Sequence, residues 1–356
     1  MINVSRPFLP PREEFYEYLD GIWSRNYLTN NGPLVRELEQ RLGQYLGVEN
    51  ILFLANGTLA LQLAIKAMSL KGEIITTPFS YIATISSAVW ENCTPVFVDI
   101  EQDSLNIDSE LIERSITSNT SAILATHVFG NPCNIDAIED IAVRHGLKVI
   151  YDAAHCFSTE YKETSVLNYG DISCISFHAT KLFHTVEGGA VVAKTADTRE
   201  KLFHMRNFGH AGFYKYEGVG INAKNSEFHA AMGLCNLRYI DSILDKYRFL
   251  HGVYDRLLDD NKVKRPVINK SASYNHSYYP AVFRTEKKCM EAIAILETAG
   301  INPRRYFYPP LNKIEYVSDC SCLVAEDIAA RILCLPVFFD LEEDQVARIC
   351  ECVNQV

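Results

Sequence analysis

Short apolar runs alternate along most of this chain with longer stretches of helical periodicity. The apolar runs predict strands at 51–54, 73–77, 95–99, 121–126, 147–151, 172–177 and 190–193. Helices are expected around them, at 12–23, 34–46, 59–68, 80–90, 108–116, 134–145, 197–206 and 226–239. Because strands alternate with helices, the pattern predicts an α/β domain whose mainly parallel sheet is covered by helices.

The regular alternation ends near residue 207. The segment 207–221 contains four glycines among aromatic residues, and irregular loops of about 15 residues are often functional or part of an interface. A helical stretch at 243–258 is then expected to lead into a smaller domain, with a strand at 278–283, a rigid loop at 304–310 and helices at 287–299 and 342–352. We therefore expect a large domain over 1–245 and a small C-terminal domain over 246–356.

Composition narrows the class of protein. The chain has 356 residues and a net charge of −10, which argues against broad nucleic-acid binding but allows a local site for an anion. The N-terminal residues lack an apolar signal region, and no run reaches the roughly 20 apolar residues of a membrane span, so a cytoplasmic protein is expected. Eleven cysteines are scattered without a CxxC pair, which favours thiols in a reducing compartment over a metal site.

Two polar residues at strand ends indicate chemistry. Lys181 follows the strand at 172–177 and Asp152 follows the strand at 147–151. Open α/β sheets bind ligands at the carboxyl ends of their strands. An amine that can form a Schiff base and an anion that keeps a pyridine nitrogen protonated are what pyridoxal phosphate requires. By themselves, the two residues are also compatible with a surface lysine and a helix-capping aspartate.

Two other strand ends carry candidate binding residues. Asn56, Gly57 and Thr58 open a helix, where free backbone N–H groups and the helix dipole attract a phosphate, although an ordinary capped turn has the same residues. This turn is not the GxGxxG that a nicotinamide-dependent oxidoreductase would carry. Tyr81 opens the next helix, where its ring is placed either to stack on a cofactor or to pack in a core or interface.

Eight motifs follow one another along the chain. They are NGTLAL (56–61), PFSYIAT (78–84), HVFGNPCNIDAI (127–138), VIYDAAH (149–155), SFHATK (176–181), EGGA (187–190), GINAKNSEFHAAMGL (220–234) and the pair YYPA and YFYPPL (278–281 and 306–311). Their order resembles that of the DegT/StrS sugar aminotransferases over essentially the whole chain. The resemblance implies a fold-type-I pyridoxal phosphate enzyme with a large α/β domain, a small C-terminal α+β domain, and a homodimer whose subunits share the active sites.

The resemblance also implies the catalytic residues. Lys181 matches the Schiff-base lysine, Asp152 the partner of the pyridine nitrogen, and His155 a residue beside the cofactor ring. Relatives that remove a sugar hydroxyl carry His in place of this lysine, so Lys181 favours a transaminase over a dehydratase. A sensor that only binds cofactor or sugar is the alternative of another class.

Five further residues match cofactor contacts of the family. Gly57, Thr58 and Ser176 match its phosphate site, and Tyr81 matches the aromatic residue that stacks on the ring. Asn222 matches an asparagine that reaches the cofactor phosphate of the neighbouring subunit.

The substrate expected from the resemblance is a nucleotide-linked keto sugar, with L-glutamate as amino donor. The SFHxxK form, in which His178 precedes Lys181, resembles enzymes that aminate C4 of a 4-keto-6-deoxy sugar. The variant HATKLFHTVEGG is most similar to enzymes that make dTDP-4-amino-4,6-dideoxyglucose for O-antigen or related glycans. A UDP- or GDP-linked sugar, or amination at C3, is the alternative.

The sequence leaves several points open. It does not distinguish a gluco from a galacto product, nor a dimer from a higher oligomer. Lys224 stands where many relatives have Arg, which keeps the charge but loses the bidentate fork. His178 is either a substrate contact or a packing residue, and Arg304 and Arg305 either hold a pyrophosphate or form a solvated basic pair.

Overall fold

A seven-stranded sheet forms the centre of the large domain in the computed structural model, which describes residues 1–317 and 320–356. Six strands are parallel, and β10 runs antiparallel to both of its neighbours. In spatial order the strands are β2 (Ile51–Leu54), β10 (Gly189–Ala193), β9 (Ile172–Ser176), β6 (Lys148–Asp152), β5 (Thr120–Thr126), β3 (Gly72–Thr76) and β4 (Cys93–Phe97). The predicted mainly parallel α/β sheet is confirmed.

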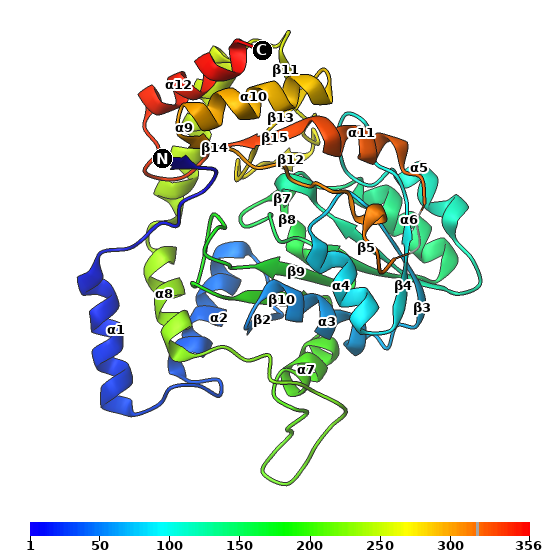
Figure 1. Cartoon of the computed structure of the whole chain (residues 1–356). Coiled ribbons are helices and arrows are strands. Elements are labelled where there is room, and N and C mark those ends of the chain that lie inside the picture. Colours follow the sequence, from blue (N-terminus) through cyan, green and yellow to red (C-terminus); the bar gives the residue numbers. More distant parts are fainter. Residues whose placement is uncertain (318–319) are drawn as a thin grey trace.

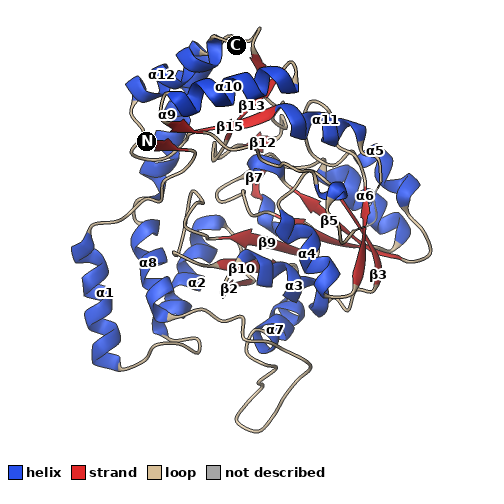
Figure 2. Ribbon diagram, in the orientation of Figure 1, coloured by secondary structure: helices blue, strands red, loops and turns tan. Residues whose placement is uncertain are grey.

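Helices cover both faces of this sheet (Figures 1 and 2). Alternate residues of each strand enter separate apolar clusters, as Leu52 and Phe53 of β2 do, because successive side chains of a strand point to opposite faces. One cluster includes residues of α3 (Gly57–Ala67), α4 (Ile82–Trp90) and α7 (Ala196–Met205). The other includes residues of α2 (Pro33–Leu46), α6 (Ile135–His145) and α8 (Glu227–Leu237).

The C-terminal part builds a second, smaller α+β unit. Its antiparallel sheet contains β11 (Val263–Lys264), β13 (Tyr279–Phe283) and β15 (Ile332–Leu335). Around it lie α9 (Ile240–Leu257), α10 (Glu286–Thr298), α11 (Leu323–Arg331) and α12 (Glu343–Asn354). β1 (Ile2–Asn3) joins this unit by pairing with β14 (Ile301–Asn302). We propose the division at 245/246, a position that lies inside α9.

Some elements differ from the sequence prediction. The helix expected at 108–116 is a single turn, α5 (Ser109–Ile112), followed by a 3₁₀ turn at Glu113–Ser115. The helix α11 and the strand β15 were not predicted, because Arg331 ends the one and Ile332 begins the other, so no turn residue marks a boundary between them. A long helix, α1 (Arg12–Arg25), lies at the outside of the molecule beside α8 (Figure 1). No helix in the described ranges is long and apolar enough to cross a membrane.

The two units are joined by a helix cap and an apolar cluster. Asp99, just after β4, accepts hydrogen bonds from the backbone N–H groups of Val324 (2.9 Å) and Ala325 (2.8 Å) at the start of α11. A carboxylate at a helix N-terminus satisfies free N–H groups and favours the helix dipole. Nearby, Phe79 and Phe129 of the large domain pack with Phe307 of the small one. These contacts hold the loop at 304–310 over the ends of the central strands.

A buried histidine makes the stability of this fold depend on pH. His127 is fully buried, its Nδ1 accepts a hydrogen bond from the backbone N–H of Cys133 (3.1 Å), and its ring stacks on Tyr151 with centroids 4.5 Å apart. Burial lowers the pKa of His127 to about 3. Below its ordinary pKa of about 6.5, the unfolded chain binds a proton that the folded chain does not, so acid destabilises the fold.

We expect His127→Asn to reduce this acid sensitivity, because the amide oxygen can still accept the Cys133 hydrogen bond and the side chain does not titrate. Between pH 6 and pH 4 the free energy of unfolding of the wild type should fall more steeply than that of the variant, by about 1.4 kcal/mol per pH unit. Urea unfolding at several pH values measures the difference. Equal slopes in wild type and His127→Asn would contradict the prediction.

Candidate active site

Asp152 and Lys181 lie at the same edge of the central sheet. Asp152 is the last residue of β6, opposite Cys174 of the neighbouring strand β9, and Lys181 follows β9 in the next loop. Burial lowers the pKa of Lys181, and the negative charge of Asp152 acts in the opposite direction. The two groups are therefore close enough to interact electrostatically, which the sequence could only suggest from the strand ends.

The Asp152 carboxylate is held by hydrogen bonds from α4 and from the turn that follows β6. One oxygen accepts the hydroxyl proton of Thr84 in α4 (2.7 Å), and the other accepts the backbone N–H of Ala154 (3.1 Å). Thr84 is in turn 2.7 Å from the hydroxyl of Ser80, which is 2.9 Å from that of Thr126. Burial raises the pKa of Asp152, while these donors and Lys181 act against the rise. This buried hydroxyl chain fixes the carboxylate in one orientation.

The amine of Lys181 contacts a tyrosine from the small domain. Its Nζ donates to the hydroxyl of Tyr278 at 3.1 Å, and it also lies 5.7 Å from the centre of that ring. Tyr278 comes immediately before β13. Neither Thr84 nor Tyr278 was assigned a role from the sequence, although both lie in the quoted motifs. Only their positions within those motifs could have indicated them, because a lone Thr or Tyr carries no periodic signal.

His155 forms part of an aromatic cluster beside Lys181. Its ring is nearly parallel to those of Phe129 (7°) and Phe307 (1°), and it lies 4.6 Å from the Tyr278 ring centre. Its Nδ1 accepts the backbone N–H of Phe129 (3.1 Å), which leaves the proton of the neutral ring on Nε2. Burial, with a smaller contribution from the charge of Lys181, shifts the pKa of His155 well below its ordinary value. The imidazole is therefore a neutral, rigid wall of the site.

The turn at the start of α3 meets the end of β9. The Asn56 side chain caps the helix by accepting the N–H of Leu59 (2.8 Å). The N–H groups of Gly57 and Thr58 belong to the first turn, which has no intrahelical partners for them. A Cβ added to Gly57 would lie only 3.1 Å from Cβ of Ser176, so glycine lets the Ser176 hydroxyl approach this turn. The arrangement forms a small cradle of donors suited to a phosphate.

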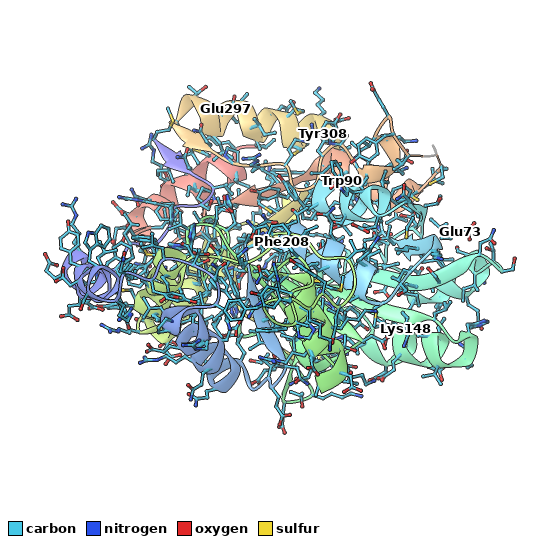
Figure 3. All side chains as sticks on the ribbon, turned by 90° about the horizontal axis from the view of Figure 1, so that it is seen from below. Glu73, Trp90, Lys148, Phe208, Glu297 and Tyr308 are labelled. Carbon is cyan, nitrogen blue, oxygen red and sulfur yellow. The ribbon has the colours of Figure 1, made fainter. Side chains whose placement is uncertain are left out.

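Tyr81 and Asn222 are not brought into contact with these residues. The Tyr81 side chain is 57% exposed at the start of α4, although its phenol is close enough to influence the charge of Lys181. Asn222 is exposed and accepts a hydrogen bond from Lys224 (2.6 Å). The loop at 207–221 projects from the body of the molecule between α7 and α8 (Figure 1), and Phe208 lies near its base (Figure 3).

The sequence left the roles of Arg304, Arg305 and His178 open, and the structure gives the three side chains different surroundings. Arg305 donates to the backbone carbonyl of Ala330 at the end of α11 (2.6 Å) and stacks on the Tyr308 ring (3.6 Å), so it supports the small domain. Arg304 is exposed, and no carboxylate in residues 1–317 and 320–356 pairs with it. The ring of His178 is 2.8 Å from the Thr180 hydroxyl and 3.6 Å from the Glu187 carboxylate, at the surface next to Lys181.

A cavity of about 520 Å³ lies elsewhere, between the loop at 102–105, the segment 260–266, the end of β13 and α11. None of the predicted site residues lines it. The residues that carry the chemistry are instead gathered at the sheet edge and covered by the aromatic cluster. In the part of the chain that is described, no cluster of His, Cys, Asp and Glu side chains could hold a metal ion.

Comparisons with known proteins agree with this geometry. The family model for DegT/DnrJ/EryC1/StrS aminotransferases matches residues 11–354. Two relatives named dTDP-4-amino-4,6-dideoxy-D-glucose transaminase are 40% identical (Shigella dysenteriae; 100% of this chain and 99% of the relative) and 38% identical (Escherichia coli; 98% and 96%).

The fold agrees as well. The crystal structure of DesI with its TDP-sugar product superposes with a TM-score of 0.94 at 32% identity, covering 99% of this chain and 92% of that one. The chain therefore belongs to the DegT/DnrJ/EryC1/StrS family of pyridoxal phosphate-dependent aminotransferases.

Proposed function

We propose that this protein uses pyridoxal phosphate to transfer an amino group from L-glutamate to C4 of dTDP-4-keto-6-deoxy-D-glucose. The product would be dTDP-4-amino-4,6-dideoxy-D-glucose, a precursor for O-antigen or related glycans. The observation that supports this chemistry is that the Lys181 amine, the Asp152 carboxylate and a phosphate cradle lie at the same edge of the sheet. The similarity over the full chain to two transaminases named for this product supports the choice of sugar.

The residues present are suited to the cofactor. Gly57, Thr58 and Ser176 offer N–H and hydroxyl donors at a helix N-terminus, which is a favourable environment for a phosphate dianion. Asp152, whose carboxylate is oriented by the hydrogen bond from Thr84, can pair with a protonated ring nitrogen. Such a cation beside Asp152 would lower the pKa of the carboxyl and oppose the rise that burial causes.

Pyridoxal phosphate supplies an aldehyde carbon for the amino group and a pyridinium ring that withdraws electrons. Lys181 contributes the base. Because burial lowers its pKa, Nζ loses its proton more readily than an exposed lysine, so it can take a proton from the amine-bearing carbon and return it later as an acid. His155 stays neutral and adds no competing positive charge. The aromatic cluster around it limits the access of water.

We propose a homodimer as the working unit, with Asn222 and the loop at 207–221 completing the site of the neighbouring subunit. In the single chain this loop exposes Phe213 and Tyr214 by 95% and 98%. Large exposed aromatic side chains on a projecting loop favour burial in an interface. Asn222 lies at the base of the same loop, where it pairs with Asn207 and accepts a hydrogen bond from Lys224, and this exposed position is consistent with a role in the partner.

The first test is the visible absorption of the purified protein. We expect a yellow protein whose visible band disappears with L-glutamate and returns with dTDP-4-keto-6-deoxyglucose, since the two half-reactions are separate. UDP- and GDP-linked keto sugars and a C3-keto sugar are the comparison substrates. Return of the band only with one of these would contradict the proposed sugar. A protein that stays colourless with added cofactor would favour a non-catalytic sensor.

Lys181→Ala is expected to reduce turnover by at least about 10³-fold, because it removes both the nucleophile and the base. The variant should remain folded and should still bind pyridoxal phosphate through the phosphate cradle and Asp152. Activity, circular dichroism and cofactor fluorescence measure the three properties. Lys148→Ala is the matched control, because Lys148 is the exposed first residue of β6, at the end of that strand opposite Asp152 (labelled in Figure 3). Amine transfer retained in Lys181→Ala would show that the lysine is misassigned.

Gly57→Ala is expected to weaken cofactor binding by about tenfold, roughly 1.4 kcal/mol, because the added Cβ would crowd Ser176 and shift the cradle. Equilibrium titration of the cofactor-free protein with pyridoxal phosphate gives the dissociation constant. Gly252→Ala is the control, since an added Cβ at this position in α9 meets no atom within 4 Å. An unchanged dissociation constant in Gly57→Ala would exclude the turn at 56–58 as the phosphate site.

A further inference from the structure

Tyr278 presents its hydroxyl to the amine of Lys181 from a different domain. The distance from Nζ to the phenol oxygen is 3.1 Å, and no other side-chain hydrogen bond of Nζ is found in residues 1–317 and 320–356. We propose that Tyr278 is a positioning residue for this amine, holding Nζ through its hydroxyl while the lysine is free to carry a proton. The proposal rests on the proposed function and names a further residue of the same site.

The Tyr278 ring has little freedom to move. Its face and edges are bounded by His155 (4.6 Å between ring centres), Phe129 (5.6 Å) and Tyr306 (5.9 Å). The Tyr274 hydroxyl donates to the backbone carbonyl of Tyr278 at 3.2 Å. An aromatic side chain in such a cluster keeps one rotamer, so the hydroxyl is fixed where the amine needs it.

The segment before Tyr278 is also tied to the large domain. The Asn275 amide donates to the backbone carbonyls of His155 (2.7 Å) and Phe157 (2.8 Å), and the Ser277 hydroxyl donates to His155 (3.3 Å). The loop that carries His155 therefore positions both the imidazole and the tyrosine. Lys181 is hydrogen-bonded to a phenol of the other domain and interacts electrostatically with a carboxylate of its own.

A phenol can serve both states of the amine. Its oxygen accepts a hydrogen bond from the ammonium form, and its O–H donates to the lone pair of the neutral form. Burial raises the pKa of Tyr278, so the phenol itself stays protonated and does not act as the base. The other titratable groups that affect the pKa of Lys181 through their charge are Asp152, Tyr306, Tyr81 and Cys156. His155 also lies near Lys181. Tyr278 differs from these groups because its hydroxyl contacts Nζ directly.

Tyr278→Phe tests this contact, because it removes one oxygen and keeps the ring. The full-length protein without cofactor is labelled with ¹³C at the ε carbon of lysine, and Lys181→Ala identifies the Lys181 signal. The ammonium form loses a charge-assisted acceptor, which is stronger than the bond to the neutral amine, so the pKa of Lys181 should fall by about one unit. An unchanged titration midpoint in Tyr278→Phe would overturn the proposal.

Tyr279→Phe is the matched control. Tyr279 is the next residue, and its hydroxyl donates to Asp255 (2.8 Å), away from Lys181. The variant Tyr279→Phe should leave the midpoint of the Lys181 titration unchanged. An equal shift in both variants would mean a general effect of the small domain and would overturn the proposal. In the wild type, labelled with ¹³C at the tyrosine ζ carbon, the Tyr278 signal, assigned by its loss in Tyr278→Phe, should follow the Lys181 titration and stop doing so in Lys181→Ala. A Tyr278 signal that does not respond to the Lys181 titration would contradict the contact.

The cofactor-loaded enzyme gives a separate readout. Proton transfer at Nζ should become slower in Tyr278→Phe, so kcat is expected to fall by about tenfold with little change in KM for the sugar. A normal kcat together with the shifted lysine titration would overturn the role in the reaction. Lack of activity with the proposed sugar in the wild type would instead count against the proposed function, since the lysine titration needs no substrate.

Discussion

The site depends on keeping a carboxylate and an amine in a buried place where neither is stable as an isolated charge. Burial raises the pKa of Asp152 and lowers that of Lys181, so each group is pushed towards its neutral form. Each also opposes the shift of the other through its charge. The hydroxyl of Thr84 and the N–H of Ala154 supply the remaining stabilisation of the carboxylate. The surrounding structure is arranged to make these contacts possible.

The parallel strands deliver both groups to the same edge, and the small domain covers that edge. Asp99 caps α11 across the domain boundary, and Phe307 packs on Phe79. The aromatic cluster then encloses the Lys181 amine with Tyr278. The stability of the domain contact and the accessibility of the amine are therefore coupled, because the same side chains serve both.

Much of the fold was predictable because it depends on local periodicity. The central strands are short apolar runs buried on both faces, most helices of the large domain have apolar patterns of period 3.6, and β10 was found as a strand although its antiparallel direction was not predicted. α11 and β15 were missed because Arg331 ends the one and Ile332 begins the other, so no turn residue marks a boundary between them. The short α5 was overestimated because a sequence pattern does not show where tertiary contacts end a helix.

The sequence by itself determined the residues available for chemistry and their places at strand ends, which is why Lys181, Asp152 and Gly57 could be named and the family recognised from ordered motifs. The tertiary structure decided which side chains meet them. Thr84 is 68 positions from Asp152 in the chain, and Tyr278 is 97 positions from Lys181. Contacts over such separations arise from the packing of helices and domains on the sheet, and no local pattern of hydrophobic and polar residues encodes them.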